Sequence, residues 1–163
     1  MNLVRYKKNN EYCIGHLVND HELVDLSSFS ESKDILNFII NKKHKDKEIK
    51  KFINSSSTLL DTQNLEICAP IRPRSLRDAY AFRQHVETSR RNRGLDMIKE
   101  FDDFPVYYYS NPDSVVGPGE IEVEDFFMSK LDFELEVAVV IAKEGRNIDC
   151  KNADQYIGGI TIM

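Results

Sequence analysis

Hydrophobic and polar residues alternate along the first part of the chain in the way that β-strands require. Two segments with apolar residues at helical spacing follow, at 35–40 and 49–53, and the first of them comes after Ser32, a residue type that begins helices. The pattern therefore predicts several short strands followed by one or two helices. The segments that we expect to be strands are residues 3–6, 12–18 and 22–26.

A polar, serine-rich stretch at residues 54–58 separates these elements from the remainder of the chain. Short polar stretches of this kind commonly connect domains. We therefore expect residues 1–58 to form a small N-terminal β domain with one or two helices and a linker. Residues 59–163 would form the second region, which carries the candidate chemistry.

The second region opens with prolines that keep the chain extended, and then changes to a helical pattern. Ser75 and Asp78 fit a capping box, in which the acidic side chain reaches back to the start of the helix. In such a helix Asp78 and His85 would share one face. From the pattern alone, Asp78 is a helix cap and His85 an ordinary packed or surface residue, with a functional pair as the alternative.

The most strand-like run of the chain, residues 131–141, contains two glutamates. In a strand, Glu134 and Glu136 would point to the same side, about 7 Å apart. Two carboxylates beside an apolar run are costly to desolvate unless a cation lies between them. A bound metal ion explains the pair, and a solvent-facing strip that becomes buried only after Val137 is the alternative.

Three consecutive tyrosines lie in another β-prone segment, at residues 107–109. Successive side chains of a strand alternate between its faces, so Tyr108 would face away from its two neighbours. One face can then pack against the core while the other offers a phenol.

Composition and charge narrow the classes of function. The net charge of −5 argues against a general nucleic-acid binder. No apolar run approaches the roughly 18 residues of a membrane helix, and the first residues lack the apolar core of a signal peptide. The odd number of cysteines favours reduced, mostly buried thiols in a cytoplasmic protein. These cysteines are Cys13, Cys68 and Cys150.

Positive charge is nevertheless concentrated in one segment. Between Ile71 and Gly94 there are seven arginines and only two acidic residues. An anionic substrate, a subunit interface, a nucleic acid or plain solvation would each explain this density. The acidic flanks make the nucleic acid the weakest of the four explanations.

Several of these segments occur together in one order and spacing. They are residues 74–86, Asn111-Pro112, Gly117-Pro118-Gly119, the Glu134 and Glu136 pair, and residues 156–163. As a set they closely resemble the fumarylacetoacetate hydrolase family, from about Ile71 to the last residue. The resemblance implies an α+β, mainly β fold. A small β-rich N-terminal domain would precede the start of a fumarylacetoacetase-type mixed β-barrel or roll.

The resemblance also implies a role for particular residues. It favours a substrate carboxylate as the partner of the arginine-rich segment, because arginine offers such a group two parallel hydrogen bonds. Donors that supply only oxygen select a hard cation, Mg²⁺ or alternatively Ca²⁺ or Mn²⁺. The implied roles are metal binding by Asp78, Glu134 and Glu136, activation of water by His85, and substrate contact by Tyr80 and Tyr108.

The function implied in this way is a metal-dependent hydrolase that cleaves a carbon–carbon bond in a small anionic 1,3-diketo or 2-oxo acid. The intact protein would be a cytoplasmic homodimer with no nucleic-acid or membrane partner. Hydration, isomerisation and decarboxylation of 2-oxo acids use the same scaffold, and the residues do not choose among these reactions. A binding module without catalytic activity is the alternative from a different class.

The sequence stops at Met163, inside an apolar, strand-like segment. In relatives this segment continues into an Asn-Asp-Trp-Ser motif, whose aspartate completes the metal site, and into most of the catalytic β-fold. We therefore expect a fragment or truncated product, or a second chain that supplies the remainder. The 163-residue chain alone is expected to be inactive.

Overall fold

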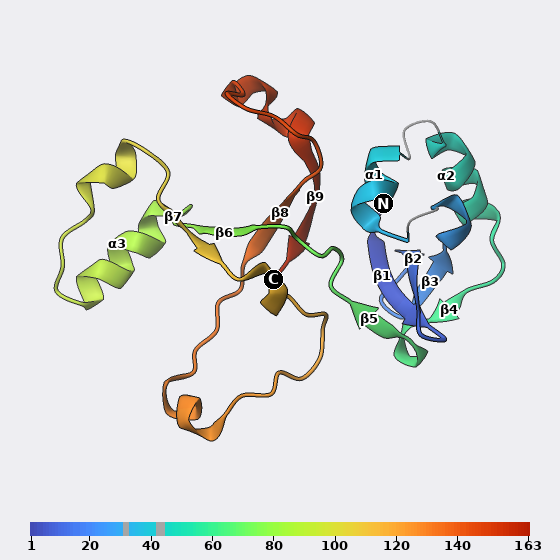
Figure 1. The fold of residues 1–163 in the computed structure, drawn as a ribbon, viewed down its shortest axis with the longest axis horizontal. Coiled ribbons are helices and arrows are strands. Elements are labelled where there is room, and N and C mark those ends of the chain that lie inside the picture. The colour runs from blue at the N-terminus through green and yellow to red at the C-terminus, as the bar shows by residue number, and fades with distance from the viewer. Residues whose placement is uncertain (31–32, 42–44) are drawn as a thin grey trace. The chain divides into compact units, whose positions relative to one another are not determined.

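A computed structural model describes residues 1–30, 33–41 and 45–163. The fold is α+β and mainly β, as predicted (Figure 1). It divides into two compact units, one made of residues 1–71 and 116–163 and the other of residues 72–115.

The regular elements comprise strands and three α-helices within the described residues. The strands are β1 (Leu3–Lys8), β2 (Glu11–Leu17), β3 (Glu22–Asp25), β4 (Leu60–Asp61), β5 (Glu66–Cys68), β6 (Leu76–Ala79), β7 (Tyr107–Ser110), β8 (Val137–Ile141) and β9 (Ile157–Ile162). The α-helices are α1 (Ile35–Asn41), α2 (Asp46–Ser55) and α3 (Arg83–Asn92).

The N-terminal part of the chain forms a five-stranded sheet in the order β4-β3-β2-β1-β5, with antiparallel pairing throughout. The three predicted strands and both predicted helices are confirmed. Ser32 lies outside the described residues, and the carboxylate of Asp34 accepts a hydrogen bond of 2.9 Å from the backbone N–H of Asn37 in α1. Such a bond satisfies one of the amides that a helix start leaves unpaired.

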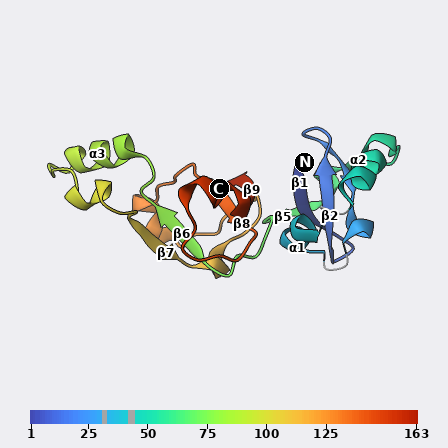
Figure 2. The same ribbon diagram turned by 90° about the horizontal axis from the view of Figure 1, so that it is seen from above.

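Hydrophobic clusters form on both faces of this sheet. Helices α1 and α2 lie next to this sheet (Figures 1 and 2). On one face, Ile35, Phe38 and Ile49 from the two helices pack with Ile14 and Val24. Full burial of such side chains stabilises a fold by roughly 1.5–3 kcal/mol each. The second cluster consists of Val4, Tyr6, Cys13 and Leu23, with Leu17, Leu60, Leu65 and Ile67 packed against it.

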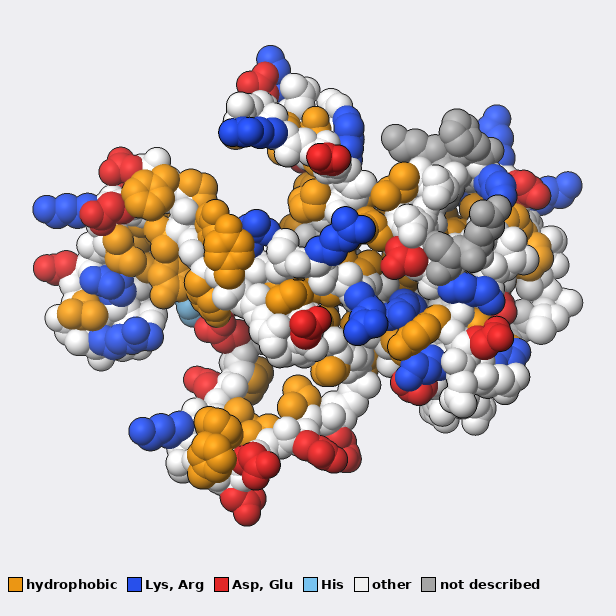
Figure 3. Space-filling model, viewed as in Figure 1, with side chains coloured by type: hydrophobic (Ala, Val, Ile, Leu, Met, Phe, Trp, Pro, Cys, Tyr) orange, Lys and Arg blue, Asp and Glu red, His pale blue; other side chains and the backbone are white. Residues whose placement is uncertain are grey.

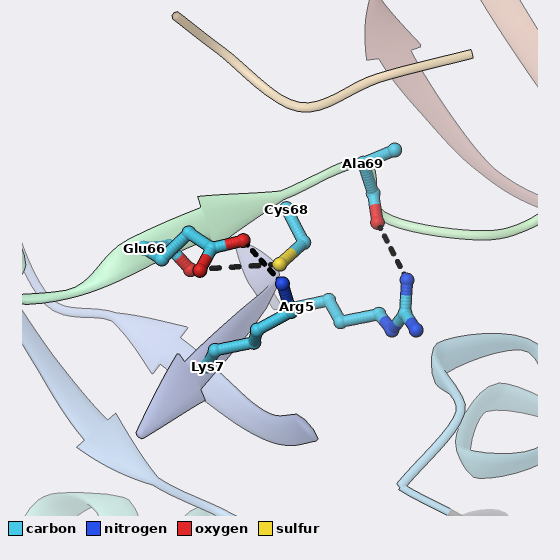
Figure 4. A network of polar contacts seen from close by, with 5 residues as sticks. All are labelled: Arg5, Lys7, Glu66, Cys68 and Ala69. Carbon is cyan, nitrogen blue, oxygen red and sulfur yellow. Dashed lines mark hydrogen bonds and ion pairs between the residues drawn. The ribbon is translucent and has the colours of Figure 1, made fainter. Parts of the chain in front are cut away.

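Strand β5 is held at the edge of the sheet by polar contacts with β1 (Figure 4). Lys7 and Glu66 lie opposite each other in the ladder and form an ion pair of 2.5 Å. The Arg5 guanidinium donates a hydrogen bond of 3.5 Å to the carbonyl of Ala69. The Cys68 thiol donates to the carbonyl of Glu66 at 3.5 Å, and burial raises its pKa.

Two strands of the N-terminal sheet thus come after the expected boundary at residue 58. Residues 56–59 contain no helix or strand, whereas residues 54 and 55, which the expected linker included, belong to the end of α2. The chain nevertheless returns to the same sheet through β4 and β5 before it leaves at residue 69. Whether residues 1–58 behave as a domain of their own stays a prediction.

The same unit contains a hairpin of β8 and β9, which pair antiparallel. The pairing extends one step beyond β8, because Glu136 and Met163 exchange two backbone hydrogen bonds of 2.8 and 2.9 Å. The alternative interpretation of the glutamate pair was a solvent-facing strip that becomes buried only after Val137. Several apolar side chains of β8 are instead exposed. Val137, Val139 and Ile141 are 49–60% exposed.

The remaining unit, residues 72–115, is small. Strands β6 and β7 pair antiparallel, and α3 lies between them in sequence. Val86 is the buried hydrophobic residue of α3. Most of the candidate chemistry on this unit comes from the two strands and the first turn of the helix.

Candidate functional site

Asp78 lies in a strand, so the predicted helix beginning at Ser75 is wrong. Residues 76–79 form β6, and α3 begins only at Arg83. The pairing of Leu76 with Ser110 and of Ala79 with Tyr107 keeps this segment extended. Asp78 and His85 therefore do not share a helical face.

The carboxylate of Asp78 instead binds a tyrosine of the neighbouring strand. Asp78 and Tyr108 are directly opposite in the ladder, and the Tyr108 hydroxyl donates a hydrogen bond of 2.6 Å to Asp78 Oδ2. Cβ atoms of directly opposed residues are about 5 Å apart, which lets the two side chains meet. The structure thus brings together a predicted metal ligand and a predicted substrate contact.

The other face of the β6–β7 pair carries a cluster that the sequence analysis missed. The Arg77 guanidinium lies over the ring of Tyr109, 4.8 Å from its centroid. Tyr107 and Tyr109 meet edge to face with centroids 5.8 Å apart. Hydrogen bonding to Arg77 and to Tyr107 lowers the pKa of Tyr109. Strand alternation around Asp78 would have predicted this cluster, had the segment been interpreted as a strand.

Tyr80, the other predicted substrate contact, follows β6 directly. Its backbone N–H donates a hydrogen bond of 3.0 Å to the carbonyl of Val106, which continues the contact between the two chain segments. Its side chain is 43% exposed. The phenol is therefore accessible to a ligand from solvent.

His85 lies in the first turn of α3 and is exposed. Arg83, in the same turn, donates to Glu87 at 2.9 Å and also binds Asp102. These contacts raise the pKa of Arg83, mainly through the hydrogen bond to Asp102. Arg83 and Glu87 thus hold each other on the helix surface.

The two glutamates belong to the other unit and differ in their surroundings. Glu136 extends the ladder of β8 and β9, and its side chain is half-buried. Glu134 is exposed and lies in residues 131–136, which precede the strand and have no regular structure. The expectation that both glutamates lie within one strand is therefore wrong, because β8 begins only at Val137, although the backbone of Glu136 extends its pairing with β9.

The segment that leads to and includes these glutamates combines acidic and apolar side chains on its surface (Figure 3). Phe126, Phe133 and Leu135 are 73–87% exposed. Phe133 and Leu135 alternate with carboxylates in the sequence, and further carboxylates, among them Glu122, Glu124 and Asp125, precede Phe126. The segment has apolar surface that the described residues leave uncovered.

Within the described residues, no three His, Cys, Asp or Glu side chains are grouped closely enough to hold a metal ion. Asp78 belongs to one unit, and Glu134 and Glu136 belong to the other. The three carboxylates would supply oxygen ligands, which are the type that a hard divalent cation prefers. The metal assignment therefore stays a prediction.

Two further expectations concern the whole chain. All three cysteines are free, as expected, but only Cys13 is buried, whereas Cys68 is intermediate and Cys150 exposed. In the part of the chain that the structure describes, none of the helices has the length and apolar character needed to cross a bilayer.

Comparison with known proteins gave several matches. The family model described as "Fumarylacetoacetate (FAA) hydrolase C-terminal" matches residues 75–163. A fumarylacetoacetate hydrolase domain-containing protein 2 homolog from Dictyostelium discoideum is 24% identical over 148 residues, which cover 88% of this chain and 46% of that protein. Oxaloacetate tautomerase YisK from Bacillus subtilis is 34% identical over 76 residues, 45% of this chain and 25% of that protein.

A solved structure also matches. It is fumarylacetoacetate hydrolase from psychrophilic Exiguobacterium antarcticum, with a TM-score of 0.67 and 21% identity, over 98% of this chain and 53% of that one. At this identity the likeness concerns the fold. The chain thus spans about half the length of the Dictyostelium and Exiguobacterium proteins.

Proposed function

Because the chain belongs to the fumarylacetoacetate hydrolase family, we propose that it supplies metal ligands and a general base to a hydrolase of carbon–carbon bonds. The substrate class is a small anionic 1,3-diketo acid of the acylpyruvate or fumarylacetoacetate type. The observation that carries this proposal is the hydrogen bond between Asp78 and Tyr108, since it joins two residues to which the family resemblance gives roles at one site. His85 follows on the next helix along the chain.

In this proposal Asp78, Glu134 and Glu136 hold Mg²⁺, with Ca²⁺ or Mn²⁺ as alternatives. Bound there, a hard divalent cation would stabilise the negative charge that develops on the substrate oxygens. The carboxylates contribute oxygen donors and compensate the charge of the cation.

His85 is the proposed general base. An imidazole is suited to accept a proton from water near neutral pH. The water oxygen then forms a bond to the distal carbonyl carbon, and the adjacent carbon–carbon bond breaks. Its electron pair passes to the 2-oxo group as an enolate, whose carbon then takes up the proton that His85 removed from the water. Removal of the water proton by His85 balances the first of these steps.

The phenols of Tyr80 and Tyr108 are proposed to bind substrate oxygens, and the arginine-rich segment to attract the substrate carboxylate. Arg83 is already engaged with Glu87 and Asp102, so it is not the arginine that we assign to the substrate. A cytoplasmic location and a homodimeric state belong to the same proposal.

A second candidate is tautomerisation of a 2-oxo acid. The relative that favours it is oxaloacetate tautomerase YisK, with 34% identity over 76 residues. Tautomerisation needs a proton moved between carbon and oxygen, so it would use the same carboxylates and a base without attack by water.

The test is to assay the intact protein with an acylpyruvate and with oxaloacetate, each with Mg²⁺ and after EDTA treatment. We expect EDTA-sensitive release of two acids from the acylpyruvate. Glu136→Ala should weaken Mg²⁺ binding and activity together, whereas Glu122→Ala, an exposed carboxylate outside the proposed site, should change neither. Interconversion of oxaloacetate tautomers without cleavage of the acylpyruvate would support the second candidate, and EDTA-resistant hydrolysis would contradict the metal assignment.

A further inference from the structure

The contact between Asp78 and Tyr108 occupies a defined oxygen of the carboxylate. The Tyr108 hydroxyl is 2.6 Å from Oδ2. Both residues are fixed by the ladder, where they face each other between the pairs Arg77–Tyr109 and Ala79–Tyr107. Because their backbones are held on both sides, the phenol meets the carboxylate in a defined orientation.

We infer that Tyr108 is a positioning residue that acts through Asp78 and biases the site toward Mg²⁺ over Ca²⁺. The inference rests on the proposed function, in which Asp78 is a metal ligand. Because Oδ2 accepts the hydrogen bond of the phenol, a cation bound through Oδ1 would leave this hydrogen bond intact. Tyr108 therefore favours binding of the cation through one oxygen of Asp78.

The two candidate ions differ in what they require of a carboxylate. Ca²⁺ takes about 6–8 oxygen ligands in flexible geometry and readily uses both oxygens of one carboxylate. Mg²⁺ takes about six ligands in a near-ideal octahedron and keeps several waters. If a carboxylate offers only one oxygen, Ca²⁺ loses one of the ligands that it would use. Mg²⁺ does not need this second oxygen.

This role differs from the substrate contact that the family resemblance assigns to Tyr108. A hydroxyl that only binds substrate would change KM and leave the affinities for metal ions unaltered. A hydroxyl that orients Asp78 changes those affinities in the absence of substrate. Tyr108 is 56% exposed, so both roles are compatible with access from solvent.

The experiment is calorimetric titration of the intact, metal-free protein with Mg²⁺ and separately with Ca²⁺, without substrate. Tyr108→Phe removes only the hydroxyl. We expect its Mg²⁺ affinity to fall by roughly 10-fold, in the range found when a group that orients a metal ligand is removed. Ca²⁺ affinity should fall less, so the ratio of Mg²⁺ to Ca²⁺ affinity decreases.

Tyr107→Phe is the matched control, because it makes the same chemical change one residue away on the opposite face of the strand. It should leave both affinities unchanged. Asp78→Ala separates this inference from the function on which it rests. If Asp78→Ala weakens binding of both ions but Tyr108→Phe leaves their ratio unaltered, the positioning role is refuted and the proposed site stands. If Asp78→Ala changes neither affinity, Asp78 is not a ligand and both proposals fall.

Discussion

Gly117 lies directly against the backbone of Cys68. A Cβ atom at residue 117 would come within 2.8 Å of Cys68 Cα and 2.5 Å of the carbonyl oxygen of Ile67. Both neighbours are backbone atoms of β5, the edge strand of the N-terminal sheet, and cannot rotate away as a side chain can. Glycine is thus required here for close approach of two chain segments.

Gly117→Ala should therefore destabilise the intact protein. Displacing packed backbone costs roughly 1–3 kcal/mol, which would appear as a lower midpoint of urea unfolding. The matched control is Gly159→Ala in β9, where the described residues, apart from the two chain neighbours, leave the space within 4 Å of the added Cβ empty. Equal midpoints for the two variants would show that β5 and residue 117 are not packed as described.

The buried hydroxyl of Tyr6 should make the protein less stable at alkaline pH. Its side chain is fully buried, and its hydroxyl has no hydrogen-bond partner among the residues that the structure describes. Burial, and then the negative charge of Asp25, raise its pKa above the ordinary value for tyrosine. The folded protein therefore retains this proton at a pH where the unfolded chain, which titrates near about pH 10, has lost it.

The free energy of unfolding should then be insensitive to Tyr6 below about pH 10 and fall as the pH rises above it. Tyr6→Phe should reduce this alkaline loss, and at neutral pH it should be nearly neutral, because it removes a buried hydroxyl without a partner. The measurement is urea unfolding at about pH 8 and about pH 10.5, with the exposed Tyr107→Phe as control. An identical alkaline loss in wild type and Tyr6→Phe would contradict the role of Tyr6.

Substitution of His85 should affect catalysis without affecting metal binding. In the intact protein, His85→Ala should lower turnover by roughly 10²–10⁴-fold, the usual contribution of a positioned general base. Its Mg²⁺ affinity should stay close to that of wild type, because the histidine is not a proposed ligand. Thr88→Ala, one turn further along α3, controls for changes in the helix. Loss of Mg²⁺ binding in His85→Ala would instead make the histidine a ligand.

The domain boundary at residue 58 can be tested by limited proteolysis. Residues 56–59 join α2 to β4 without regular structure, so the first cut should fall there or at Ser55. The two fragments should remain associated under native conditions, since β4 and β5 pair with β3 and β1 across the cut. Early cleavage within β2, or separation of the fragments without denaturant, would contradict this description.

The early strands and helices could be predicted because their patterns are local. Alternation in β1 to β3 and helical spacing in α1 and α2 need only neighbouring residues. The order of motifs around Asp78, His85 and the glutamate pair likewise indicated the family without any knowledge of contacts. The sequence by itself thus determined the fold class and the residue types available for chemistry.

Only the tertiary structure decided the conformation around Asp78. A capping box is a local bond between residues 75 and 78, whereas the partner strand of β6 begins about 30 residues later, at Tyr107. Pairing with β7 supplies hydrogen bonds along the whole segment and gives the carboxylate the Tyr108 hydroxyl. No local pattern encodes such distant partners. For the same reason, the addition of β4 and β5 to the N-terminal sheet could not be predicted from their short sequences.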